Sequence, residues 1–209
     1  MSNVKQKLIE RFGICEAKMA ISLDEDKLFM KSGITVIAAL AGEGKTTKML
    51  EMKQTWEEQE YTVAYVNFDG STSYNNEIID CPTNPDEIKK MYGIIEQYAT
   101  KNDIIIIDSL KSASSYYGFT IENNEEMYIM MLELRTIIRK TNCSIILVHH
   151  TFRPKNLKSF IDNFYGARAI EEQCDSGFMY YKNHAVIVKS RLGYQRDQKV
   201  FLWKLLFKV

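Results

Sequence analysis

The sequence predicts an α/β fold: a mainly parallel β-sheet with helices on both faces and an antiparallel extension at the carboxyl terminus. Two observations carry this prediction. Short apolar segments rich in β-branched residues alternate with helical patterns through most of the chain, and strands that are buried on both faces of a parallel sheet have this character. The last segments instead resemble short strands that are joined by tight turns, which indicates antiparallel pairing.

The alternation begins after an amino-terminal stretch. Residues 4–20 carry apolar side chains at helical spacing, with an interruption at Gly13. We therefore expect residues 1–32 to form a helical segment that packs on its own core or on a neighbouring subunit. The next expected elements are a strand at 34–40, a helix at 46–58, a strand at 61–68 and a helix at 86–98 that Pro85 opens.

The second half of the chain continues the pattern. Its expected elements are a strand at 104–107, a long helix at 122–140, a strand at 144–149 and three final strands at 177–181, 185–189 and 200–207. A turn at 182–184 joins the first two of these final strands. Since no internal repeat, low-complexity tract or linker interrupts the sequence, residues 33–209 are expected to form one domain.

Composition and charge narrow the class of protein. The 209 residues are 45% hydrophobic and 26% charged, with no apolar stretch near the length of a membrane span and no secretory signal. We expect a cytoplasmic protein that does not contact a membrane. The cysteines lack metal-ligand spacing and are expected to be small hydrophobic residues in the core; they are Cys15, Cys81, Cys143 and Cys174.

The formal net charge is zero, because 27 basic residues balance 27 acidic ones. A protein that coats nucleic acid through bulk charge would be basic. Any contact with nucleic acid must therefore come from a local patch, or from a patch that is repeated around an oligomer.

Residues 39–46, Ala-Leu-Ala-Gly-Glu-Gly-Lys-Thr, fit the Walker A pattern with alanine in place of its first glycine. They lie between an expected buried strand and an expected helix. In such a loop the glycines let backbone N–H groups point at phosphate oxygens, the lysine reaches the β- and γ-phosphates, and the next hydroxyl binds Mg²⁺. The residues expected to bind ATP and Mg²⁺ are Ala41, Gly42, Glu43, Gly44, Lys45, Thr46 and Thr47.

Asp108 follows four isoleucines, at the end of another expected buried strand. The carboxyl ends of the strands form the ligand-binding edge of an open α/β sheet. Asp108 is therefore expected to hold Mg²⁺ with Thr46, through water, and the phosphate loop favours this role over that of a strand-capping aspartate.

On these residues the sequence resembles the RecA-like P-loop ATPase superfamily, and it is similar in particular to single-domain hexameric replicative DNA helicases of plasmids and phages. The resemblance covers residues 33–203. Besides the two motifs above, it depends on four features. The first is Asp108-Ser109-Leu110-Lys111 together with the later strand that ends in His149-His150-Thr151, and the second is Gly166-Ala167-Arg168-Ala169-Ile170 followed by Asp175. The third is Lys189-Ser190-Arg191 followed by Gly193, and the fourth is the strand that ends at Asp69.

The resemblance implies catalytic roles. Asp69 stands where the family usually has a glutamate that polarises the attacking water, and the shorter side chain leaves two alternatives, which are action through a second water and slow hydrolysis. His150 is expected to sense the γ-phosphate, because only one of two successive strand residues can face the nucleotide. Lys189 and Arg191, taken as lying on one strand face, are expected to reach the ATP of a neighbouring subunit. The full catalytic set is Lys45, Asp69, Asp108, His150, Lys189 and Arg191.

The resemblance also implies that loops 111–121 and 152–164 face the central channel of a ring. Each loop contains cations and aromatic residues, a combination that suits single-stranded nucleic acid. Packing in the core is an equal alternative for the tyrosines. The residues expected to bind nucleic acid are Lys111 in the first loop and Arg153, Lys155 and Lys158 in the second, which is favoured.

The leading hypothesis is an ATP-driven DNA helicase or single-stranded DNA translocase that assembles from copies of this one domain as a homo-oligomeric ring, in the manner of a hexamer, or as a filament. The alternative is an ATP-dependent helicase loader or regulatory switch whose partner is another replication protein, which the short Asp69 favours slightly. A third hypothesis is a nucleotide-binding protein without turnover. Stimulation of hydrolysis by DNA favours the first, and stimulation by a partner protein favours the second.

Overall fold

The computed structural model describes residues 32–69, 78–80, 91–151, 166–181, 184–191 and 199–201 of the chain. Several predictions lie outside these residues. They are the amino-terminal helix at 4–20, the start of the helix at 86–98, the loop with Arg153, Lys155 and Lys158, the turn residues 182–183, Gly193, the end of the last strand, Cys15 and Cys81.

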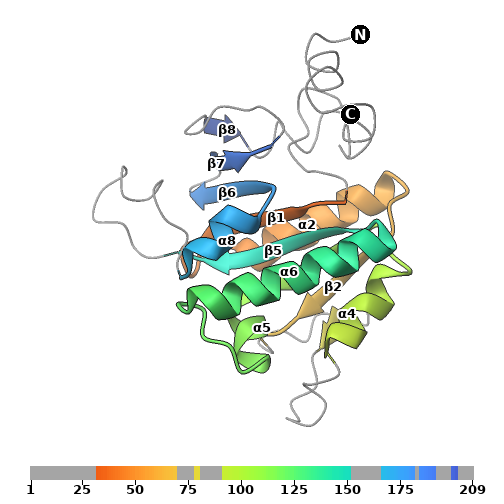
Figure 1. Ribbon diagram of the computed structural model, residues 1–209. Helices are drawn as coiled ribbons and strands as arrows, with labels where there is room; N and C mark the ends of the chain where they lie inside the picture. Colours follow the sequence, from red (N-terminus) through yellow and green to blue (C-terminus); the bar gives the residue numbers. More distant parts are fainter. Residues whose placement is uncertain are drawn as a thin grey trace, which may run out of the picture.

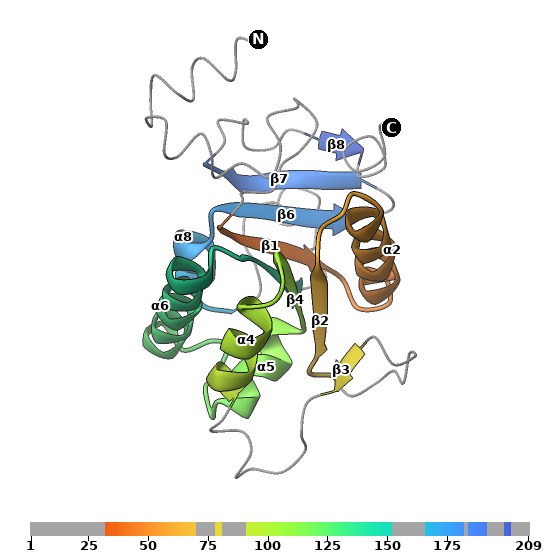
Figure 2. The same ribbon diagram turned by 90° about the vertical axis from the view of Figure 1, so that its right-hand side faces the viewer.

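An eight-stranded sheet forms the centre of the described structure, in the order β3-β2-β4-β5-β1-β6-β7-β8 (Figures 1 and 2). The pairs from β3 to β6 are parallel, and β7 and β8 continue the sheet in antiparallel pairing. The strands are β1 (Ile34–Ala39), β2 (Val63–Asn67), β3 (Ile78–Asp80), β4 (Ile104–Asp108), β5 (Ser144–His150), β6 (Ser176–Tyr181), β7 (His184–Ser190) and β8 (Lys199–Phe201).

The predicted sheet is thus confirmed, with one correction. The strand expected at 177–181 was assigned to the antiparallel extension, but β6 pairs with β1 in parallel and only β7 and β8 run antiparallel. The helix α8 (Arg168–Gln173), which lies just before β6, allows β6 to enter the sheet from the same end as β1.

Helices cover both faces of the sheet. Figure 2 shows α2 (Lys45–Glu58) on one face, and α4 (Met91–Ala99), α5 (Leu110–Tyr116), α6 (Asn124–Thr141) and α8 on the other. The isoleucines of β4 alternate between the two layers: Ile104 and Ile106 pack on the α2 side, whereas Ile105 and Ile107 pack on the α6 side. This alternation explains why the strand is apolar without interruption.

The longest of the described helices, α6, lies close to its predicted bounds and has a clear start and stop. The side chain of Asn123 accepts hydrogen bonds from the N–H groups of Glu125 and Glu126, and Asn142 ends the helix in a left-handed conformation. The segment 111–121, however, was expected to be a loop and begins with α5. The side chain of Ser109 caps this helix by accepting a hydrogen bond from the N–H of Ser112.

Two further findings concern the core and the helices. Cys143 and Cys174 are buried and unpaired, as expected for small apolar side chains. Among the described residues, no helix has both the length and the apolar character that a membrane crossing requires.

Candidate nucleotide-binding site

The phosphate loop connects the end of β1 to the start of α2. Gly42 and Gly44 have φ values of 81° and 75°, in the left-handed region where other residues are strained. Among the described residues, no atom beyond the adjoining ones lies within 4 Å of the position that a Cβ would take at either glycine, so backbone conformation, and not crowding, requires glycine here. Ala41, Gly42 and Gly44 are exposed, as is Thr47 in the first turn of α2, so the loop is open to a ligand at a helix N-terminus.

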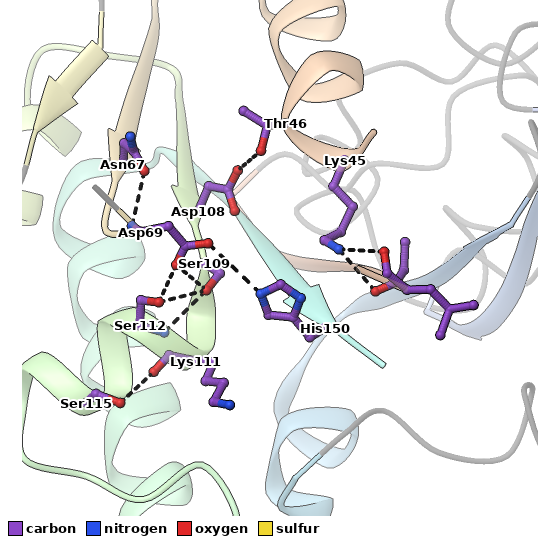
Figure 3. A network of polar contacts seen from close by, with 12 residues as sticks. Lys45, Thr46, Asn67, Asp69, Asp108, Ser109, Lys111, Ser112, Ser115 and His150 are labelled. Atoms are coloured by element: carbon purple, nitrogen blue, oxygen red, sulfur yellow. Dashed lines mark hydrogen bonds and ion pairs between the residues drawn. The ribbon is translucent and has the colours of Figure 1, made fainter. Parts of the chain in front are cut away.

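Lys45 lies across this loop with only 9% of its surface exposed. Its Nζ donates to the carbonyl oxygens of Ala39 at 3.2 Å and Leu40 at 2.9 Å (Figure 3). Burial lowers the pKa of Lys45, and the nearby carboxylates of Asp108, Asp69 and Glu43 oppose this shift. Within the described part of the chain the ammonium has neutral carbonyl partners and no ion pair, which suits a group that awaits an anion.

Thr46 and Asp108 meet above the carboxyl edge of the sheet. The Thr46 hydroxyl donates to Asp108 Oδ2 at 2.9 Å (Figure 3), so the structure brings the two predicted metal ligands together. Asp108 is buried. One hydroxyl and one carboxylate are the oxygen ligands that Mg²⁺ takes beside phosphates and water, and the donor chemistry therefore fits the expected ion.

Tyr65, which no sequence pattern indicated as a site residue, also contacts Asp108. Its hydroxyl donates to the same Oδ2 at 2.5 Å from a ring that is 1% exposed. Burial, followed by the charge of Asp108 and the hydrogen bond to it, raises the pKa of Tyr65, so the phenol remains protonated. The alternation of strand residues could have placed Tyr65 on the face of Asn67, but no local pattern says which acid its hydroxyl meets.

Asp69 lies directly after β2 and is held by the start of α5. Its Oδ1 accepts hydrogen bonds from Ser109 Oγ at 2.9 Å and from Ser112 Oγ, and its N–H donates to Asn67 Oδ1 at 3.1 Å (Figure 3). Ser109 and Ser112 were not predicted as site residues, because no helix was expected directly after the strand that ends at Asp108. The N-cap signal of serine before the helical spacing Leu110, Ala113 and Ser114 could have identified them.

His150 ends β5 beside Ala39 of β1, and its Nε2 is 4.0 Å from Asp69 Oδ2. Burial and the charge of Lys45 lower the pKa of His150, although Asp69 opposes them, so the imidazole is mostly neutral at neutral pH. His149 is fully buried in the strand. Of the two histidines, His150 lies at the site, as expected from the alternation along the strand.

Lys111 lies in the first turn of α5, exposed to solvent. It is close enough to His150 that its charge contributes to lowering the histidine pKa. The one predicted nucleic-acid residue that the structure describes is therefore next to the nucleotide site.

Lys189 and Arg191 lie at the opposite edge of the sheet. Asp175 marks this edge, because its Oδ2 accepts from the N–H of Ile34 at the start of β1, at 2.8 Å. Arg191 Nη1 is 2.7 Å from Asp175 Oδ1, whereas the phosphate loop follows the far end of β1. A six-residue strand spans about 20 Å, so the Arg191 side chain does not reach the phosphate loop of its own chain.

These two cations were expected on one face of a strand, and that arrangement stays a prediction. β7 ends at Ser190, and Arg191 follows it directly. Lys189 Nζ donates to the carbonyl oxygens of Glu171 and Glu172 at 2.6 and 2.7 Å, near the end of α8. The N–H of Arg191 donates to the carbonyl oxygen of Asp175 at 3.0 Å, which continues the antiparallel pairing of Ser190 with Ser176.

No model of a protein family matches the sequence, and no curated protein does. Solved structures match over most of the chain. The RadB recombinase has a TM-score of 0.58 and 16% identity, over 82% of this chain and 86% of that one. A KaiC-like protein from the hyperthermophilic archaeon Pyrococcus horikoshii OT3 has a TM-score of 0.55 and 18% identity, over 82% and 85%. The likeness shows the fold, and the chain has the RecA-like P-loop architecture that its sequence predicted.

Proposed function

We propose that this chain binds ATP with Mg²⁺, hydrolyses it, and uses the energy as an oligomeric motor on single-stranded DNA, as a replicative-type helicase or translocase does. The observation that carries the proposal is the meeting of Lys45, the Thr46–Asp108 pair and Asp69 around one open glycine loop.

The residues present fit the two groups. A buried ammonium with neutral partners and a helix N-terminus both favour a triphosphate. Lys45 would bind the β- and γ-phosphates, while Thr46 and Asp108 would hold Mg²⁺. The ion, when bound, neutralises phosphate charge.

Asp69 is the carboxylate that would take the proton from the attacking water. As the water oxygen forms a bond to the γ-phosphorus, the bond from that phosphorus to the bridging oxygen breaks, and ADP carries away the electron pair. Ser109 and Ser112 occupy Oδ1 of Asp69, which leaves Oδ2 on the side of His150. The neutral imidazole of His150 can then donate to a γ-phosphate oxygen.

The positions of Arg191 and of the phosphate loop, at opposite edges of the sheet, support an oligomer. Arg191 is 49% exposed at the edge far from its own phosphate loop, so it is available to a second copy. In our proposal, Arg191 and the nearby Lys189 approach the nucleotide of the neighbouring subunit, where their charge stabilises the charge that develops on the transferred phosphoryl group. Single-stranded DNA would contact Lys111 together with Arg153, Lys155 and Lys158.

The test is the ATP hydrolysis rate with and without single-stranded DNA, in the native chain and in Lys45→Ala. Lys140→Ala is the matched control, because this exposed lysine pairs with Glu96 on the surface. We expect DNA to raise the native rate several-fold, Lys45→Ala to lose roughly 100-fold or more, and the control to behave as the native chain. A rate that is the same in Lys45→Ala and the native chain would contradict the proposal.

A second function is distinguished by the same assay. Asp69 is short and already accepts two serine hydroxyls, which favours slow hydrolysis and a loader or switch that acts on a protein partner. For such a protein, DNA leaves the rate unchanged and a replicative helicase partner raises it.

A further inference from the structure

Tyr65 reaches the nucleotide site from inside the core. It lies on β2 opposite Ile106 of β4, whereas Asn67 lies opposite Asp108. Tyr65 therefore lies two residues before the position on β2 that pairs with Asp108, a distance of about 7 Å along a strand. Residues two apart in a strand point to the same face of the sheet. A tyrosine side chain is long enough to cover this step, and its hydroxyl meets Asp108 Oδ2 at 2.5 Å.

The ring of Tyr65 is held in place by packing in the core. It belongs to the buried cluster between the sheet and α2, together with Met49, Met52 and Ile106. The helix α2 also carries Thr46 in its first turn. The core that holds the tyrosine ring thus also supports the helix that presents the second donor to Asp108.

Asp108 Oδ2 accepts from Thr46 and from Tyr65. Neither Lys nor Arg forms an ion pair with this carboxylate in the described residues, so two neutral hydroxyls set its orientation. Outer donors of this kind fix the direction of a metal-binding carboxylate, and their loss typically weakens metal binding by about 10- to 100-fold.

We propose that Tyr65 is a positioning residue for the Mg²⁺ site: its buried hydroxyl holds the Asp108 carboxylate in the orientation that binds the ion beside Thr46. This inference rests on the proposed function, because it concerns the same site. It adds that part of the metal affinity is set by the strand β2 and by the core beneath it.

The experiment compares Tyr65→Phe with the native chain in a titration of a fluorescent ATP analogue at a series of Mg²⁺ concentrations and in EDTA. The variant removes one oxygen and keeps the ring that fills the core. We expect the Mg²⁺ concentration that gives half of the full increase in nucleotide affinity to rise about tenfold, while the affinity in EDTA stays unchanged. Tyr128→Phe, on the exposed face of α6, is the control and should match the native chain.

An unchanged Mg²⁺ dependence in Tyr65→Phe would overturn the inference while leaving the proposed function in place. If the native chain itself shows no Mg²⁺-dependent nucleotide binding, the proposed function fails, and the inference fails with it. Asp108→Asn guards against a packing effect. If Tyr65 acts through Asp108, adding Tyr65→Phe to Asp108→Asn causes no further change in Mg²⁺ dependence, whereas two additive losses contradict the mechanism.

Discussion

Two buried aspartates lie at opposite edges of the same sheet and are satisfied in different ways. Asp108, at the carboxyl edge, accepts from the neutral hydroxyls of Thr46 and Tyr65. Asp175, at the other edge, lies between the guanidinium groups of Arg135 and Arg191 and also accepts from the N–H of Ile34.

The difference separates the candidate ligand site from a structural cluster. At Asp175 the charges are compensated within the chain, so the cluster stabilises the start of β1 and orients Arg191. At the phosphate loop the ammonium of Lys45 and the carboxylate of Asp108 have hydrogen-bond partners without opposite charge in the described structure. Charged groups whose hydrogen-bond partners carry no opposite charge are typical of a site that binds an ionic ligand.

The sharpest way to test the comparison is to neutralise each aspartate. Asp175→Asn leaves two arginines without their carboxylate, and we expect it to lower the free energy of unfolding by about 3–5 kcal/mol. Asp108→Asn keeps an oxygen for Thr46 and Tyr65, so the expected change is less than about 1 kcal/mol. Urea unfolding followed by circular dichroism measures both, and equal losses would mean that the two carboxylates are alike.

A smaller effect is expected at Asp69. Ser112→Ala removes one of the two hydroxyls that hold Oδ1 of this carboxylate. The carboxylate becomes more mobile, so it is less often in the position from which it would take the proton of the attacking water. We expect kcat for ATP to fall roughly 5- to 10-fold with KM unchanged. Ser115→Ala on the same helix is the control, since its hydroxyl donates to the carbonyl of Lys111 instead. A rise in KM with kcat unchanged would assign Ser112 to nucleotide binding.

The smallest expected effect is on pH dependence. The folded chain lowers the pKa of His150, mainly through burial and Lys45, so the unfolded chain binds this proton more readily. Stability from this source is complete above the ordinary histidine pKa of about 6.5 and is lost as the pH falls below it. We expect Tm to fall less between pH 7.5 and 5.5 in His150→Gln than in the native chain. An identical fall in both proteins would contradict the assigned environment of His150.

Local patterns were enough to predict most of the fold and the centre of the site. The isoleucines before Asp108 indicated a strand buried on both faces, and Gly42 and Gly44 indicated a phosphate loop between a strand and a helix. Both features depend on neighbours in sequence, where spacing and side-chain type carry the information.

The missed residues depend on contacts between distant segments. Tyr65 meets Asp108 because β2 pairs with β4 in one register, and no pattern along the chain sets that register. Ser109 and Ser112 meet Asp69 across the same pair of strands. Arg191 was expected to reach a neighbouring subunit, and no pattern along the chain predicted its ion pair with Asp175. The chemical groups typical of such a site are thus visible in the sequence, whereas the partners that position them depend on the folded structure.

The central claim is that opposite edges of the sheet, from two neighbouring copies, form one catalytic site. Mixing two variants tests this claim most directly. Lys45→Ala and Arg191→Ala should each lose DNA-stimulated ATP hydrolysis when assayed alone, while Arg139→Ala, at an exposed arginine in α6, should not. In an equimolar mixture of the two variants, about a quarter of the interfaces of a ring join an intact phosphate loop to an intact Arg191. We predict that hydrolysis returns in the mixture. No recovery, or full activity of Arg191→Ala alone, would contradict a site that is shared between subunits.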